Sequence, residues 1–226
     1  CLVGSEMCIR DRSSVKLYFM MGLPTETTED LDGIADLAKK VVDAYFAVPR
    51  GERAKGLRVV CSASVFVPKP FTPFQWEPQD TQEMVREKQS HLREKLRIKG
   101  VTFNYHESDL SYLEACFARG DRRMGQVLLR AYQKGCMLDG WTELFKYDMW
   151  REAFAELGID PAFYAYRRRE KDEIMPWDVI DCGVTKEFLW REKEKAEKAQ
   201  TTKDCRKGCN LSLIHISEPT RQEAIS

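Results

Sequence analysis

The sequence predicts an α/β fold at its start, followed by a mostly helical C-terminal extension. Two segments, 15–21 and 58–67, are almost continuously apolar and rich in β-branched or aromatic residues, as buried strands are. A segment with helical periodicity lies between them. Strands that lack polar alternation and are joined through a helix are typical of parallel pairing in an α/β sheet or barrel.

The helix between the two strands is predicted from its apolar face and from its first residues. Apolar side chains recur at helical spacing along 25–47, and Thr27 with Asp30 three residues later is suited to a capping pair. Acidic residues crowd the same end, where the helix dipole is positive. The first strand therefore stops at Gly22, and the helix begins directly after the short turn "GLPTE".

A stiff loop follows the second strand. The segment "PKPFTPFQWEPQD" holds four prolines, which exclude a regular helix. Its aromatic residues Phe71, Phe74 and Trp76 either line a cavity or pin the loop to the extension. We favour the second interpretation.

The rest of the chain is predicted to be mostly helical. Six segments have helical periodicity, and four of them end in a glycine that suits a C-cap. A short strand is expected at 101–106, while Asp160 and Thr185 are the expected N-caps of the last two helices. The six segments are 81–100, 107–120, 121–135, 139–158, 159–168 and 184–200.

Composition limits the classes of function. Lys plus Arg and Asp plus Glu each number 36, so the formal net charge is zero. This balance gives no electrostatic case for a nucleic-acid or membrane surface as a whole, and no apolar run approaches the length of a membrane span. The scattered cysteines favour a reducing cytoplasm over a disulfide scaffold. Four of them are predicted to be buried thiols: Cys61, Cys116, Cys136 and Cys182.

One cluster of charges and two histidines have residue types that occur in binding sites. The run "RGDRRMG" places Arg119, Arg122 and Arg123 around Asp121. It either grips an anionic substrate or RNA phosphate, or it is a helix start in which Asp121 is the cap and the arginines are solvated or paired. We favour the helix start. His91 and His106 are isolated in the sequence and are interpreted as surface or loop residues.

Both ends of the chain read as translated sequencing adapter. The head "CLVGSEMCIRDR" (1–12) and the tail that begins "LSLIHISEPTR" (211–226) match the two strands of one transposase-type adapter. We therefore expect both segments to be adapter-derived and not native. The native segment is then 13–210, an internal piece of a longer gene product.

Four segments, taken in order, resemble one protein family. Together they look like the later part of a radical S-adenosylmethionine (SAM) barrel and, more narrowly, like the bacterial cobalamin-domain-containing radical SAM proteins of uncharacterised function. The resemblance implies the last strands of a partial radical SAM (β/α) barrel at 13–78 and a mainly helical, family-specific extension at 79–210. The segments are "YFMMGLPTETTEDLDGIADLA", "SVFVPKPFTPFQWEPQ", "EACFARGDRRMGQVLLRAYQKG" and "PWDVIDCGVTKEFLWREKEKA" with "TTKDCRKGC".

The resemblance implies an enzyme that uses SAM, an iron–sulfur (4Fe-4S) cluster and cobalamin. The implied reaction is methyl transfer to, or rearrangement on, an unknown substrate, which RNA could be. In such barrels the cofactor lies at the C-terminal ends of the strands. The turn residues Gly22, Pro24, Glu26 and Thr27 are therefore expected beside SAM, with Glu26 accepting from its amino group or ribose. The simpler alternative is that Glu26 only complements the helix dipole.

The cluster ligands of the family, a CxxxCxxC set, do not occur in 13–210. The resemblance places them upstream, so a missing N-terminal barrel and cobalamin domain are the expected partners and the fragment alone is expected to be inactive. Cys205 and Cys209 form at most an incomplete zinc or iron–sulfur site. The alternative function, from another class, is a helical docking module for RNA or a protein partner without its own catalysis.

Overall fold

The computed structural model describes residues 13–203, which form two compact units that interleave in sequence. The first unit holds the chain up to Phe66 and the segment Asp80–Tyr112, and the second holds Val67–Gln79 and the chain from Leu113 on. This grouping differs from the sequence-based division at residue 78, because it places another helix and strand with the first unit. Expectations about 1–12 and 211–226 lie outside the described residues.

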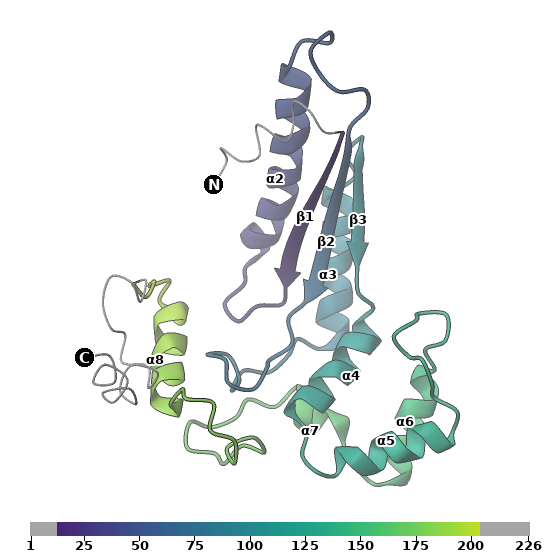
Figure 1. Ribbon diagram of the computed structural model, residues 1–226, viewed down its shortest axis with the longest axis vertical. Helices are drawn as coiled ribbons and strands as arrows, with labels where there is room; N and C mark the ends of the chain where they lie inside the picture. The colour runs from purple at the N-terminus through teal and green to yellow at the C-terminus, as the bar shows by residue number, and fades with distance from the viewer. Residues whose placement is uncertain (1–12, 204–226) are drawn as a thin grey trace, which may run out of the picture. The chain divides into compact units, whose positions relative to one another are not determined.

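The first unit is a parallel three-stranded sheet. Its strands are β1 (Ser14–Met21), β2 (Arg58–Val65) and β3 (Val101–Tyr105), in the order β1-β2-β3. The arrowheads of all three strands point the same way (Figure 1). The predicted parallel pairing of the first two strands is therefore confirmed. Helix α2 (Thr28–Ala47) connects β1 to β2, and α3 (Gln82–Lys95) precedes β3.

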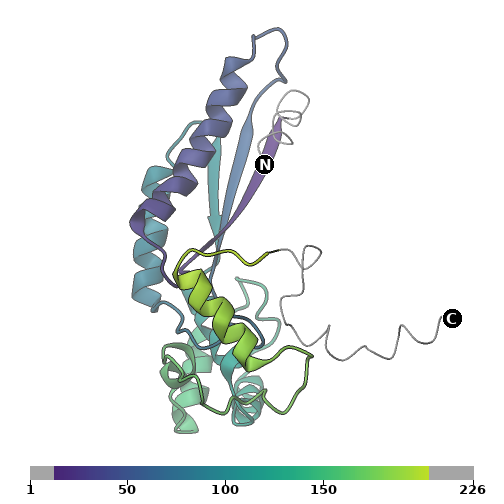
Figure 2. The same cartoon turned by 90° about the vertical axis from the view of Figure 1, so that its left-hand side faces the viewer.

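Both helices cover the same face of the sheet. Figure 2 shows α2 and α3 together on one side of the strands. The core of the unit forms there, from the apolar face of α2, the inward residues of the strands and Val85, Leu92 and Leu96 around α3. The side chains of Lys16, Tyr18 and Met20 point to the opposite face and are exposed, Tyr18 by 75%.

The exposed face continues across the sheet with polar residues. The register aligns Tyr18 with Ser62 and Asn104, and it aligns Met20 with Ser64. Among residues 13–203 the sheet ends at β1 on one side and at β3 on the other, so no closed barrel is formed. What the structure establishes is a mixed α/β fold with a small parallel sheet.

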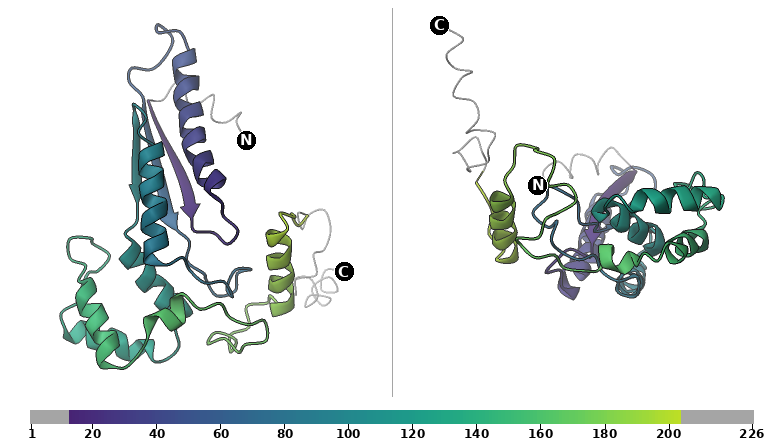
Figure 3. Two further views of the ribbon diagram at one scale, coloured as in Figure 1. Left: turned by 180° about the vertical axis from the view of Figure 1, so that it is seen from behind. Right: turned by 90° about the horizontal axis from the view of Figure 1, so that it is seen from below.

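The second unit consists of helices and long loops. Helix α4 (Ser108–Arg119) crosses the boundary between the units in sequence. Helices α5 (Met124–Gln133) and α6 (Tyr147–Glu156) lie side by side (Figure 3). Helix α7 (Pro161–Ala165) has Asp160 as its N-cap, and α8 (Lys186–Glu197) has Thr185, as predicted. The predicted helix at 139–158 begins only at Tyr147, because turns and irregular backbone occupy its first eight residues.

The proline-rich loop is anchored by buried side chains. Trp76 is 1% exposed and packs edge-to-face on Trp190 of α8, with 5.0 Å between ring centroids. The neighbouring Glu77 is buried and forms ion pairs with Arg168 at 2.6 Å and with Lys193 of α8 at 3.0 Å. The prediction that Trp76 pins this loop to the extension is therefore confirmed.

None of the helices within 13–203 has the length and apolarity required to cross a membrane.

The cysteine prediction holds at three positions and is wrong at one. Cys61, Cys116 and Cys136 are buried, whereas Cys182 is exposed. Cys182 lies in the loop before α8, in the segment "DVIDCG", where residues 178–182 are all exposed and pack against no apolar layer. The apolar neighbours Val179 and Ile180 are themselves exposed.

We predict that Cys182 reacts with an aromatic disulfide reagent in the folded chain, whereas the three buried thiols react only after unfolding. Burial raises the pKa of Cys61 to about 11 and that of Cys116 to about 12, which suppresses the reactive thiolate. The other four cysteines are first replaced by serine, and thiols are counted before and after denaturant is added. A fast reaction that persists in Cys182→Ser would contradict this packing.

Candidate functional site

The turn after β1 is the first candidate site, because it follows a strand at the carboxyl edge of the parallel sheet. Its backbone is unusual at two positions, since Gly22 has φ +83° and Thr25 has φ +72°. The Glu26 N–H closes the turn by donating to the Leu23 carbonyl at 3.0 Å. The chain therefore reverses within a few residues and enters α2 at Thr28.

The carboxylate of Glu26 folds back under this turn. Its two oxygens accept from the Gly22 backbone N–H at 3.0 and 2.9 Å, and one of them also accepts from the Lys88 ammonium at 2.7 Å. The side chain is only 6% exposed. Glu26 is therefore engaged in holding the turn, and the expectation that it accepts from a cofactor stays a prediction that this geometry does not favour.

Lys88 of α3 joins the turn to the segment that enters that helix. Its ammonium lies 2.7 Å from Glu26 and 2.7 Å from Asp80. Burial by itself lowers the pKa of Lys88, but the hydrogen bonds to Asp80 and Glu26 outweigh it, so the pKa is raised. Lys88 therefore stays charged and bridges two carboxylates that would otherwise repel each other.

Gly22 is required for two separate reasons. A positive φ strains a residue with a side chain, and a Cβ atom built at Gly22 would lie 2.8 Å from an Asp80 carboxylate oxygen. The close approach of Asp80 thus depends on the absence of a side chain. Sequence reasoning named Gly22 and Glu26 but missed Lys88 and Asp80, which lie far along the chain and carry no local pattern.

The other two predicted turn residues have different surroundings. Thr27 is the N-cap of α2 and forms a full capping box with Asp30, as the sequence indicated. Pro24 is partly exposed within the turn. A shallow pocket of about 390 Å³ lies beside the turn, between the first turns of α2 and the exposed side of α3. It is lined by Glu26, Thr27, Thr28, Leu31, Met84, Glu87, Lys88 and His91.

The two histidines belong to the first unit. His91 is on α3, partly exposed, and its Nε2 lies 2.7 Å from an Asp32 carboxylate oxygen. His106 is exposed after β3, and its backbone carbonyl accepts from the Gln89 amide. His106 fits the predicted surface or loop position, whereas His91 has a helical position and a carboxylate partner.

The arginine-rich run lies directly before α5, as favoured from the sequence, but Asp121 is not the cap. The N-cap is Arg123, and no side chain donates or accepts a capping hydrogen bond there. Asp121 accepts from the backbone N–H of Arg123 at 2.9 Å and pairs with its guanidinium. Arg122 is exposed. The hydrogen bonds from Arg123, supported by that of Tyr164, hold the pKa of the Asp121 carboxyl at about 2. A shallow pocket of about 480 Å³ lies beside these residues and Pro176.

Arg119 corrects the sequence interpretation, because it is neither solvated nor paired with an acid. It is fully buried and donates to the carbonyls of Ala165 at 2.9 Å and Arg167 at 2.8 Å. Burial, together with Arg169 and Arg167, lowers the pKa of its guanidinium to about 10. Arg119 therefore ties the segment after α7 to the end of α4 and is not available to a ligand.

The described residues offer no metal centre. Within 13–203, no group of three or more His, Cys, Asp or Glu side chains is placed to hold a metal ion. Cys205 and Cys209 lie outside the described residues.

Comparison with known proteins gives one relative of unassigned role. An uncharacterized protein of Methanocaldococcus jannaschii is 31% identical over 141 residues, which cover 58% of this chain and 29% of that protein. The chain thus spans less than a third of the relative's length. No family model matches the chain. No solved structure matches it either.

We predict that Gly22→Ala lowers the free energy of unfolding by roughly 1–3 kcal/mol, the cost of a strained backbone position. The added methyl group also displaces Asp80 from Lys88. Gly33→Ala is the matched control, because Gly33 lies inside α2 with open space around it. That change should stabilise the chain by about 0.5–1 kcal/mol. Urea unfolding followed by circular dichroism measures both, and equal effects would contradict the geometry of the turn.

We predict that Asp121 adds stability that is lost in acid. Its folded pKa of about 2 lies below the ordinary value of 3.8, so the contribution is present above pH 3.8 and disappears as the pH falls through 2. The side chain is 32% exposed, which reduces the contribution to on the order of 1 kcal/mol. Urea melts at several pH values should show Asp121→Asn destabilised near neutrality and approaching the stability of the unsubstituted chain as the pH falls through 2. A constant difference would contradict this assignment.

Proposed function

We propose that this chain is the C-terminal part of a cobalamin-associated radical SAM enzyme, acting in the cytoplasm by methyl transfer or rearrangement. The observation that carries the proposal is the one-sided parallel sheet with the Gly22–Glu26 turn at its carboxyl edge. A slice of a (β/α) barrel has this arrangement, since its helices cover the outside and its functional loops follow the strands.

The residues on the open face support a barrel over a doubly wound sheet. Parallel sheets normally have both faces covered, and a doubly wound sheet would need an apolar second face to pack against helices. Here the exposed face carries Lys16, Ser62, Ser64 and Asn104 beside Tyr18 and Met20. Mixed polar side chains suit the wall of an interior that holds a substrate.

The described residues fit only part of the cofactor set. No iron–sulfur ligands are placed among 13–203, and the two Glu26 oxygens are already engaged. We therefore derive no chemical step through the cluster or cobalamin. Within the proposal, Glu26 is a positioning residue that fixes the Gly22 backbone at the mouth of the barrel.

The relative's length agrees with a larger parent. The matched region is only 29% of the Methanocaldococcus jannaschii protein, which leaves room for the upstream barrel and cobalamin domain. Those parts would be supplied by the same parent polypeptide. The substrate, which RNA could be, follows only from the family resemblance.

A second candidate function, a docking module, is favoured by an apolar surface in the second unit. Leu128, Leu129 and Tyr132 recur at helical spacing on α5 and are exposed. Met137, Leu138 and Trp141 are exposed in the loop that follows. Exposed apolar side chains of this number suit a protein partner better than RNA.

The test requires the full-length parent, reconstituted anaerobically with iron and sulfide. We predict cluster-dependent conversion of SAM to 5′-deoxyadenosine by the parent and none by the 226-residue chain, because the cleavage step needs an open-site cluster. Glu26→Gln in the parent should weaken SAM binding about tenfold, near 1.4 kcal/mol, since an amide replaces two acceptors by one.

The matched control is Glu29→Gln, which changes an exposed carboxylate in the first turn of α2. It should leave SAM affinity unchanged. Equal affinities in both variants would remove Glu26 from the cofactor site. A parent that cleaves no SAM would favour the docking module in place of the enzyme.

A further inference from the structure

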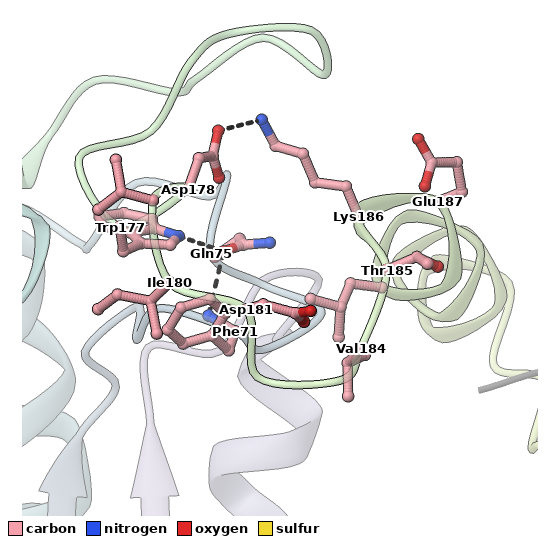
Figure 4. A pocket seen from close by; sticks show the side chains of 12 residues that line it. Phe71, Gln75, Trp177, Asp178, Ile180, Asp181, Val184, Thr185, Lys186 and Glu187 are labelled. Atoms are coloured by element: carbon pink, nitrogen blue, oxygen red, sulfur yellow. Dashed lines mark hydrogen bonds and ion pairs between the residues drawn. The ribbon is translucent and has the colours of Figure 1, made fainter. Parts of the chain in front are cut away.

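A second pocket, of about 480 Å³, lies wholly within the second unit. Its volume is in the range of small-molecule sites. It is formed by the proline-rich loop, the segment 177–181 and the residues around the start of α8 (Figure 4). No residue of the Gly22–Glu26 turn takes part in it.

Gln75 gives this pocket a fixed hydrogen-bond donor. The side chain is 2% exposed, and its Oε1 accepts from the Phe71 backbone N–H at 3.1 Å and from the Trp177 indole at 2.8 Å. Both partners are donors, so the oxygen must face them and the amide cannot be flipped. The amide nitrogen then points into the pocket, where Figure 4 shows it without a partner among the residues drawn.

The walls beside this donor suit a flat ligand. The side chains of Phe71, Trp177 and Ile180 lie on one side of the pocket, and those of Val184 and Thr185 lie on the other (Figure 4). Phe71 is held at φ +58°, a conformation that costs energy for a residue with a side chain. The hydrogen bond from its N–H to Gln75 helps to keep that conformation and therefore the position of the ring.

The rim carries uncompensated negative charge. Lys186 is neutralised by Asp178 at 2.6 Å. Asp181 and Glu187 remain, and neither has a cationic partner among residues 13–203; Asp181 accepts only from the Gly183 backbone N–H. Such a rim attracts N–H groups and repels phosphate or carboxylate groups.

We propose that this pocket binds a flat, uncharged heterocycle that carries a ring carbonyl beside N–H groups, as a guanine-type base does. The Gln75 amide donates to the carbonyl, and the rim carboxylates accept from the N–H groups. A purely structural role explains both hydrogen bonds to the Gln75 oxygen. It leaves unused the amide nitrogen, which faces the pocket with its position fixed by those two bonds and can donate to a ligand there.

Guanosine is the probe, titrated into the 226-residue chain labelled with nitrogen-15. We expect saturable shifts of the Gln75 side-chain amide and of the Trp177 indole N–H. Guanosine 5′-monophosphate should bind about tenfold more weakly, because its phosphate meets the negative rim. Guanosine that leaves both signals unchanged up to its solubility limit would overturn the proposal.

Gln75→Glu is the decisive variant. A carboxylate still accepts from Phe71 and Trp177, but it presents an oxygen where the amide presented a donor. Guanosine affinity should fall at least about tenfold, because the hydrogen bond to the ligand carbonyl is lost and two acceptor oxygens then face each other. Gln126→Glu, on the exposed side of α5, is the matched control and should bind guanosine with the affinity of the unsubstituted chain. Unchanged guanosine binding by a folded Gln75→Glu would overturn the proposal.

The exposed rim provides a test that does not depend on the folding of Gln75→Glu. Glu187→Gln removes one negative charge at the surface of α8. It should reduce the ratio of the guanosine affinity to the monophosphate affinity by about threefold to tenfold, because the monophosphate binds more tightly to a less negative rim. A ratio of affinities equal to that of the unsubstituted chain would show that the rim does not face the ligand and would overturn the proposed orientation.

Discussion

The ammonium of Lys88 is the interaction on which the geometry of the first unit depends. It lies 2.7 Å from both Glu26 and Asp80 and so connects the turn after β1 with the segment that enters α3. Without it, two carboxylates would be held close together beside the turn. With it, Asp80 approaches so closely that only glycine fits at position 22. Three features therefore depend on one another: the strained turn after β1, the Glu26 carboxylate within it and the start of α3.

The same arrangement explains why Glu26 acts on its surroundings through the backbone. Both oxygens of this carboxylate accept from the Gly22 N–H, and one of them also accepts from Lys88, so most of its hydrogen-bonding capacity is used within the protein. What it controls is the orientation of the Gly22 peptide at the carboxyl edge of the sheet. In a barrel this edge is the functional one. In the proposed radical SAM parent, the turn would therefore contribute shape and preorganised backbone groups.

The second unit buries several charged and polar side chains beside its apolar ones. Arg119 and Arg169 are buried and donate to backbone carbonyls, Glu77 forms buried ion pairs, and Gln75 fastens two segments. Buried charges add little net stability, because desolvation offsets much of the attraction. Their partners are nevertheless specific. Together with the apolar cluster of Trp76, Met175, Trp177 and Leu189, they hold the loops that form the Gln75 pocket.

The sequence by itself determined the local elements. The apolar runs of β1 and β2 and the capping box of α2 were predicted because strand burial and helix capping depend on neighbours within a few residues. The parallel pairing followed from the same runs. For Trp76 the sequence favoured packing against the extension over a cavity wall, and the ring packs on Trp190. The expected exposure or burial failed at Cys182 and Arg119, where a long-range partner, or its absence, decides the outcome.

Only the tertiary structure brought together residues that are distant in the chain. Lys88 and Asp80 meet Glu26 because α3 packs beside α2, and Gln75 meets Trp177 because the proline-rich loop folds onto the segment before α8. Neither contact leaves a periodic signal, since one residue in each element is enough to make it. The third strand, β3, joined the sheet for the same reason, because strand pairing is a long-range choice. The sequence therefore determined where helices and strands form, and the packing of distant segments decided which side chains became a site.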